Sequence, residues 1–326
     1  MLFVTNRKPK QSIRSRANRK FTFDLDDNAP SNSIFFCERT GPEAYVEIKS
    51  ENFFPRVKES DYRQVLMFIH GFSVLPEAAF GSAAELQELF DRKKPNEVQV
   101  IPLIWPCDND FGIVKDYWDD QKSADESGFS FSRLLDMFIA WQAKQIESDD
   151  MEPCYKFINV LAHSMGNRVL RETLRAWHKY ENCGEGVPKF FRNVFMVAPD
   201  VVNETLEFGQ PGELIAQSAR NVVVYFAGDD LALRASKASN LKNRIASRRL
   251  GHSGPEDFGR VPGNVCAVDC DEVNTRYDRP TGHTYFRYGD RAGEPGVVFD
   301  QIWFVIDTGR FLPDDDPRRL FIIHAD

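Results

Sequence analysis

The sequence predicts a three-layer α/β sandwich, in which helices cover both faces of a mostly parallel sheet. Past residue 60, short apolar runs alternate with longer amphipathic stretches, an order typical of parallel strands joined by crossover helices. The apolar runs are nearly continuous, as in residues 222–226, which indicates strands buried on both faces. A chain of 326 residues can bury such a sheet without needing a metal or a disulfide for stability.

Composition excludes several other classes of protein. With 42% hydrophobic and 28% charged residues, the chain is neither disordered nor fibrous. It contains no apolar run of 18 residues, and its first residues lack the order of charges of a signal peptide, so we expect a cytoplasmic protein with no membrane span. The six cysteines form no CxxC pair, which argues against a disulfide framework or a zinc ribbon.

The first 60 residues differ from the rest of the chain. Residues 33–37 and 44–48 are expected to form antiparallel edge strands before the parallel part begins. Residues 7–20 hold seven basic and no acidic side chains, which is typical of a mobile, solvated arm. We therefore predict a basic mobile arm over residues 1–20 and a single domain over residues 21–326. Because the net charge is −8, no nucleic-acid partner is expected, although the arm is the one stretch that could attract a polyanion.

Each later element follows from its own pattern. Helices are expected over residues 76–90 and 130–146, where apolar residues recur every three or four positions, and around residues 297–306. Residues 251–263, rich in glycine and proline, are expected to form a long loop or lid. The predicted parallel strands cover residues 65–70, 98–105, 156–162, 193–198, 221–227 and 265–269.

The segment around Ser164 is the most informative for chemistry. An apolar strand runs into Ala162-His163-Ser164-Met165-Gly166 and then into an amphipathic helix, which predicts a nucleophile elbow. A serine hydroxyl is a weak nucleophile until a base removes its proton, and the sharp turn would hold it toward that base. The match is imperfect because Ala162 stands where the motif has glycine, and the alternative is that Ser164 caps a helix.

A second motif, His70-Gly71-Phe72, follows the strand at 65–70. In this context the loop after that strand and the residue after the nucleophile each supply a backbone N–H to an oxyanion hole. The candidates are Phe72 and Met165. His70 is expected to be structural.

Chain order narrows the choice of acid and base, because the expected order is serine, carboxylate, histidine. The carboxylate should follow the strand at 221–227, so Asp229 and Asp230 are candidates, with Asp200 as the runner-up. Each could instead cap the next helix. The base should follow the last strand, and His283 is the histidine that meets this condition.

Several of these motifs together resemble the alpha/beta hydrolases of unknown function catalogued as DUF900, over most of the chain. This resemblance implies a serine hydrolase with an esterase- or lipase-type core, and its Asp-Leu-Ala-Leu motif favours Asp230 over Asp229. Cys107 departs from the family, which has a small hydroxyl residue after Trp-Pro. The matching stretches are residues 5–7, 68–72, 104–106, 117–127, 162–167, 198–200, 229–233 and 282–285.

The predicted function is cleavage of a small-molecule carboxylic ester, thioester or amide through an acyl-enzyme on Ser164. His283 would act as base, Asp230 would orient it, and no cofactor or metal is needed for this chemistry. The alternative is an inactive hydrolase-fold module that binds or assembles with a partner, since a fold alone does not establish activity.

Overall fold

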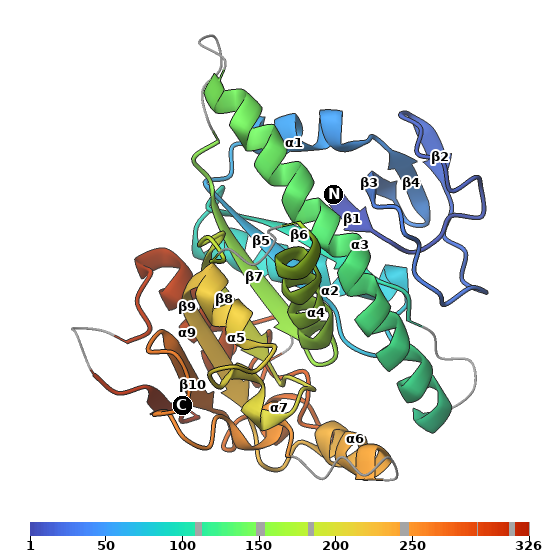
Figure 1. Cartoon of the computed structure of the whole chain (residues 1–326). Helices are drawn as coiled ribbons and strands as arrows, with labels where there is room; N and C mark the ends of the chain where they lie inside the picture. The colour runs from blue at the N-terminus through green and yellow to red at the C-terminus, as the bar shows by residue number, and fades with distance from the viewer. Residues whose placement is uncertain are drawn as a thin grey trace.

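The computed structural model confirms the α/β class (Figure 1). Eleven strands of the described part of the chain form one sheet in the order β11-β10-β9-β8-β7-β5-β6-β1-β3-β4-β2. All neighbours from β11 to β1 are parallel, whereas β3, β4 and β2 are antiparallel. The structure describes residues 1–107, 113–147, 154–181, 186–241, 248–291, 293–312 and 317–325.

The central strands match the predicted ones to within about two residues at each end. The antiparallel strands expected at residues 33–37 and 44–48 are confirmed as β3 and β4, whereas β1, β2 and β11 were not predicted. The strands are β1 (Leu2–Thr5), β2 (Arg19–Phe21), β3 (Phe35–Gly41), β4 (Ala44–Glu47), β5 (Gln64–Ile69), β6 (Val98–Ile104), β7 (Phe157–His163), β8 (Phe191–Val197), β9 (Ala219–Phe226), β10 (Val265–Asp269) and β11 (Leu320–Ile322).

Helices cover both faces of the sheet, which makes the three layers. One face packs against α1, α3, α4 and α5, and the other packs against α2 and α9. Strand β9 shows why its sequence is continuously apolar, because Val222 and Val224 face one helical layer while Val223 and Tyr225 face the other. The helices are α1 (Ser50–Glu59), α2 (Pro76–Lys93), α3 (Ile113–Glu147), α4 (Gly166–Tyr180), the 3₁₀-helix η1 (Asn203–Leu206), α5 (Glu213–Ser218), α6 (Leu231–Leu241), α7 (Leu250–Ser253), α8 (Asn274–Tyr277) and α9 (Val297–Thr308).

The N-terminal stretch differs from the predicted basic arm at both ends. Strand β1 lies inside the sheet between β6 and β3, and Phe3 and Val4 are buried. Arg7 is fully buried and donates a 2.6 Å hydrogen bond to the carbonyl of Cys107, while β2 contains Arg19 at the far edge of the sheet. The prediction rested on the high density of basic residues from Arg7 onward. The short apolar run before Arg7 is nevertheless long enough to form a strand of the sheet.

Two further segments differ from expectation. Helix α3 begins at Ile113, well before the expected start at residue 130. The stretch expected as a loop over residues 251–263 begins inside α7, and Gly251 lies directly against the backbone of Ala198 and Pro199. No helix in the described ranges is both long and apolar enough to span a membrane.

Candidate active site

Ser164 occupies a strained turn between β7 and α4. Its φ of 53° lies in the left-handed region, which non-glycine residues rarely adopt. Backbone hydrogen bonds fix the turn: the Ser164 N–H donates to Val197 at 2.9 Å, and the Ser164 carbonyl accepts from Asn167 and Asp200, each at 3.1 Å. This is the conformation expected of a nucleophile elbow.

Close backbone approach explains the small residues around Ser164. A Cβ on Gly166 would lie 2.6 Å from the carbonyl oxygens of both Ile69 and His70, and one on Gly71 would lie 3.0 Å from the Ser164 Cβ. Ala162 is fully buried inside β7, where its methyl group joins the packed layer beneath the helices. The elbow therefore requires glycine at position 166 but tolerates alanine at position 162.

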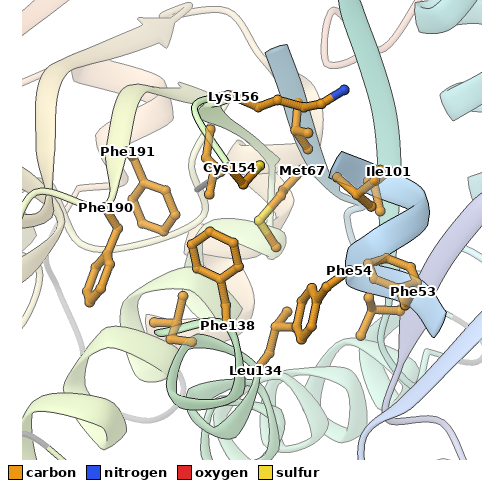
Figure 2. Close-up of a pocket in the computed structure, with 15 residues that line it drawn as sticks. Phe53, Phe54, Met67, Ile101, Leu134, Phe138, Cys154, Lys156, Phe190 and Phe191 are labelled. Atoms are coloured by element: carbon orange, nitrogen blue, oxygen red, sulfur yellow. The ribbon is translucent and has the colours of Figure 1, made fainter. Parts of the chain in front are cut away.

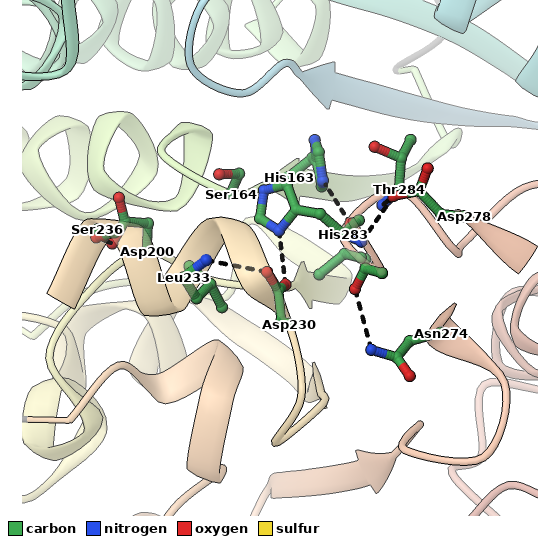
Figure 3. A network of polar contacts seen from close by, with 12 residues as sticks. His163, Ser164, Asp200, Asp230, Leu233, Ser236, Asn274, Asp278, His283 and Thr284 are labelled. Atoms are coloured by element: carbon green, nitrogen blue, oxygen red, sulfur yellow. Dashed lines mark hydrogen bonds and ion pairs between the residues drawn. The ribbon is translucent and has the colours of Figure 1, made fainter. Parts of the chain in front are cut away.

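His283 and Asp230 are in direct contact (Figure 3). The Nδ1 of His283 lies 2.6 Å from Oδ2 of Asp230, whose side chain is completely buried. The other carboxylate oxygen of Asp230 accepts the N–H of Leu233 in the first turn of α6, at 2.9 Å. Asp230 thus caps α6 and contacts the histidine at once, so the capping interpretation and the catalytic one are compatible.

The backbone of His283 is held from two sides. Oδ2 of Asp278 accepts the N–H groups of His283 and Thr284 at 2.7 and 2.8 Å, and the His163 ring lies 3.1 Å from the His283 carbonyl through its Nε2. Burial lowers the pKa of His163 well below its ordinary value, so the neutral ring donates from Nε2 to that carbonyl. No motif in the sequence pointed to Asp278, although its position five residues before His283 suits a carboxylate that fixes a loop.

Two opposing effects set the pKa of His283. Burial lowers it, but the charge of Asp230 and its hydrogen bond, with further contributions from Asp200 and Asp278, outweigh burial and raise the pKa above its ordinary value. The imidazolium form of His283 is therefore more stable relative to the neutral ring than it is in a free histidine.

Ser164 and His283 line one cavity of about 440 Å³. The His283 ring lies between Ser164 and Asp230 in Figure 3. Among the described residues, the Ser164 hydroxyl has no hydrogen-bond partner, so the structure places the serine beside the histidine–aspartate pair without bonding it to them. In enzymes without bound substrate, catalytic hydrogen bonds are often long or poorly aligned, and they tighten when substrate binds.

Phe72 and Met165 flank Ser164 from two different elements. Phe72 follows β5 and lines the cavity, while Met165 directly follows Ser164 and is buried. In the part of the chain that the structure describes, neither backbone N–H donates a hydrogen bond. Both amides thus have no acceptor among these residues, although Met165 itself does not line the cavity.

The other two candidate carboxylates contact different partners. Asp229 accepts a hydrogen bond from Asn274 rather than from His283. Asp200 is buried and accepts hydrogen bonds from Tyr117 at 2.9 Å and Ser236 at 2.7 Å, and it pairs with Arg249 at 3.2 Å. These three partners come from α3, α6 and the residue before α7, and no sequence spacing could have connected them. Asp200 lines the cavity, but the carboxylate that contacts the His283 ring is that of Asp230.

His70 supports the loop that carries Phe72. Its ring stacks on the Trp105 ring with centroids 5.3 Å apart. Its Nε2 accepts a hydrogen bond from the backbone N–H of Trp105 at 3.2 Å, and its Nδ1 lies 3.0 Å from the Gly71 carbonyl oxygen. Burial lowers the pKa of His70 to about 4, so the ring is neutral near pH 7. The thiol of Cys107 also donates to the Gly71 carbonyl, the kind of bond that a hydroxyl at this position could make.

Comparison with known proteins agrees with this architecture. Residues 47–262, more than half of the chain, match the model of a family described as alpha/beta hydrolases of unknown function (DUF900). The match includes Ser164 and Asp230 and ends before His283. No curated protein and no solved structure matches the chain. The chain therefore belongs to the DUF900 family of alpha/beta hydrolases.

Proposed function

We propose that this protein is a serine hydrolase that cleaves a carboxylic ester, with thioesters and amides as chemically related substrates. The observation that carries the proposal is the 2.6 Å contact of the buried Asp230 with His283, which lines the same cavity as the strained Ser164. A base oriented by a buried carboxylate beside a serine on a sharp turn is the arrangement that acyl transfer needs.

In the proposed reaction, the hydroxyl of Ser164 attacks the substrate carbonyl carbon while Nε2 of His283 takes its proton. The N–H groups of Phe72 and Met165 stabilise the negative oxygen of the tetrahedral intermediate. The intermediate collapses to an acyl-enzyme as His283 gives the proton to the departing alcohol. A water molecule then attacks the acyl-enzyme with the help of His283, and the carboxylic acid leaves.

The lining of the cavity supports a substrate with apolar groups near the ester. Its wall on α6 carries Leu231, Ala232, Leu233 and Ala235 beside the polar Ser236, and its other polar side chains include those of His163, Ser164, Asp200 and His283. Mostly apolar pockets with a few placed polar groups are typical of small-molecule sites.

A fluorophosphonate probe tests the proposal, because it labels an activated serine covalently. We expect the native protein to be labelled and the Ser164→Ala variant to remain unlabelled. Turnover of a short-chain ester should fall by roughly 10⁴- to 10⁶-fold in that variant. Labelling that persists in Ser164→Ala would refute the assignment of Ser164.

The second candidate function is a noncatalytic module that binds a partner through the same fold. The unbonded Ser164 hydroxyl is the observation that favours it. A native protein that neither reacts with the probe nor hydrolyses any ester of a broad acyl-chain panel would support this alternative.

A further inference from the structure

A second cavity lies toward the N-terminal ends of the strands, away from Ser164, beneath α1 and α3 (Figure 2). Its volume is about 70 Å³, close to five times the ~15 Å³ that one water molecule needs. Its wall is almost entirely carbon and includes the rings of Phe53, Phe54, Phe138, Phe190 and Phe191. Such a space suits several methylene groups better than water.

A basic groove opens beside this cavity. The groove has a volume of about 550 Å³ and shares Cys154 and Lys156 with the cavity as a common wall. We define the basic groove by its charged side chains, which are the cations Lys58, Arg63, Lys94, Lys156 and Arg192 and the carboxylates Glu97 and Asp307. This excess of positive charge contrasts with the net charge of −8 for the whole chain.

The carboxylates of the groove do not neutralise all of its cations. Lys94 lies 2.8 Å from Glu97 and 3.9 Å from Asp307. Within the described ranges, Arg63, Lys156 and Arg192 form no ion pair with a carboxylate. An anion that entered the groove would therefore meet positive charges that internal ion pairs have not already satisfied.

The groove cations differ in how they are held. The ammonium of Lys156 donates to the carbonyl and hydroxyl of Ser60 at 2.6 and 2.9 Å, which fixes it at the rim of the cavity. The guanidinium of Arg192 lies 4.4 Å from the ring centroid of Phe157 and donates to Gln64. Arg63 is exposed and remains able to turn toward a ligand. In Figure 2 the Lys156 nitrogen points away from the phenylalanine rings.

We propose that the cavity and the basic groove form one binding site for an amphiphilic anion, a carboxylate or phosphate carried on an aliphatic chain. The chain would fill the phenylalanine-lined cavity, and the head group would lie against Arg63 and Arg192. An aliphatic carboxylate is also the kind of product that the proposed hydrolysis releases, but binding at this site does not depend on that reaction.

Calorimetric titration of the Ser164→Ala protein tests the site without turnover. Octanoate and octyl phosphate are the probes, 1-octanol is the uncharged control, and butyrate is the short-chain control. We expect at least one anionic octyl probe to bind about fivefold or more tightly than 1-octanol. Because each buried methylene contributes roughly a fourfold gain in affinity, butyrate should bind at least tenfold more weakly than octanoate. The relative affinities of octanoate and octyl phosphate identify the preferred head group, and equal binding of 1-octanol would overturn the proposal.

Two substitutions locate the bound probe. Arg63→Gln removes an exposed cation and should weaken anion binding about fivefold, whereas Val57→Phe should fill the cavity and abolish binding of the octyl chain. Arg14→Gln removes an exposed arginine elsewhere and should leave binding unchanged. Unchanged binding in both Arg63→Gln and Val57→Phe would overturn the proposal, because the probe would then bind outside the cavity and the basic groove. The result is independent of probe labelling at Ser164, so either proposal can fail alone.

Discussion

At the scale of single residues, Ser164 combines backbone strain with a position beside the pair of His283 and Asp230. A left-handed φ costs a non-glycine residue roughly 1–2 kcal/mol, and the hydrogen bonds to Val197, Asn167 and Asp200 hold the residue in that conformation. The surrounding structure therefore keeps Ser164 in a conformation that is unfavourable for its residue type.

This strain predicts an unusual order of stability for variants of Ser164. The free energy of unfolding of Ser164→Gly should be about 1 kcal/mol higher than that of Ser164→Ala, because glycine adopts this φ without strain. Urea denaturation measures the difference. Ser130 lies inside α3 and is the control, since there the alanine variant should be the more stable one. The same order at both positions would contradict strain at Ser164.

The contact between Asp230 and His283 predicts that a substitution of Asp230 changes the pH dependence of activity. The base must be neutral to accept a proton, so kcat/KM should rise with pH through the pKa of His283. Asp230 raises that pKa, so Asp230→Asn should move the midpoint to lower pH, and the loss of orientation should reduce activity by roughly 10³- to 10⁴-fold.

The matched control for this prediction is Asp229→Asn. Asp229 contacts Asn274 rather than His283, so its variant should keep the native midpoint in a pH series of ester hydrolysis. A shift in Asp229→Asn that equals the shift in Asp230→Asn would argue against a specific pairing of Asp230 with the base.

At the scale of elements, the candidate site is assembled at the carboxyl ends of neighbouring strands. Phe72 follows β5, Ser164 follows β7, Asp200 follows β8 and Asp230 follows β9, while His283 lies on the loop after β10. In a parallel sheet these ends lie along one edge, so residues far apart in the sequence meet there. The direction of the strands thus accounts for the convergence.

The junction of β7 and α4 depends on the absence of a side chain at Gly166. Gly166→Ala would press a methyl group against the carbonyls of Ile69 and His70, so we expect a loss of roughly 1–3 kcal/mol in the free energy of unfolding. Urea denaturation again provides the measurement. Apart from its chain neighbours and the backbone of its own helix, a methyl group added to Gly81 in α2 would meet no atom within 4 Å, so Gly81→Ala should be neutral or stabilising by up to about 1 kcal/mol.

At the scale of the whole molecule, the N-terminal residues join the antiparallel strands to the parallel sheet. Strand β1 pairs with β6 on one side and with β3 on the other. Phe3 packs with Phe23, Tyr45 and Phe80, so one side chain connects three segments. Removal of β1 would therefore separate β3, β4 and β2 from the rest of the sheet.

Phe3→Ala tests this role. We expect it to lower the free energy of unfolding by about 3–5 kcal/mol, because a fully buried aromatic side chain is lost and a cavity remains. Ile13→Ala, in the exposed part of the same N-terminal stretch, should change stability by less than about 0.5 kcal/mol. Equal effects in urea denaturation would instead favour a mobile arm over residues 1–20.

The sequence by itself determined the α/β class, the central strands and the candidates Ser164 and His283, and it narrowed the carboxylate to Asp229, Asp230 or Asp200. It could do so because both the periodicity of apolar residues and the order of motifs along a parallel sheet can be read directly from the amino-acid sequence. Elements with short patterns, such as β1 and β11, were beyond this reasoning, since a few apolar residues do not distinguish a strand from a loop.

Only the tertiary structure decided which carboxylate contacts His283. Asp229 and Asp230 are adjacent in the sequence and have the same side chain, so composition cannot distinguish them. The direction of each side chain depends on the turn after β9 and on the capping of α6. The same holds for Asp200 and its partners Tyr117, Ser236 and Arg249, because contacts between distant elements arise from packing. The burial of β1 has this cause as well: its apolar side chains could be placed only once the neighbouring strands had defined the space between them.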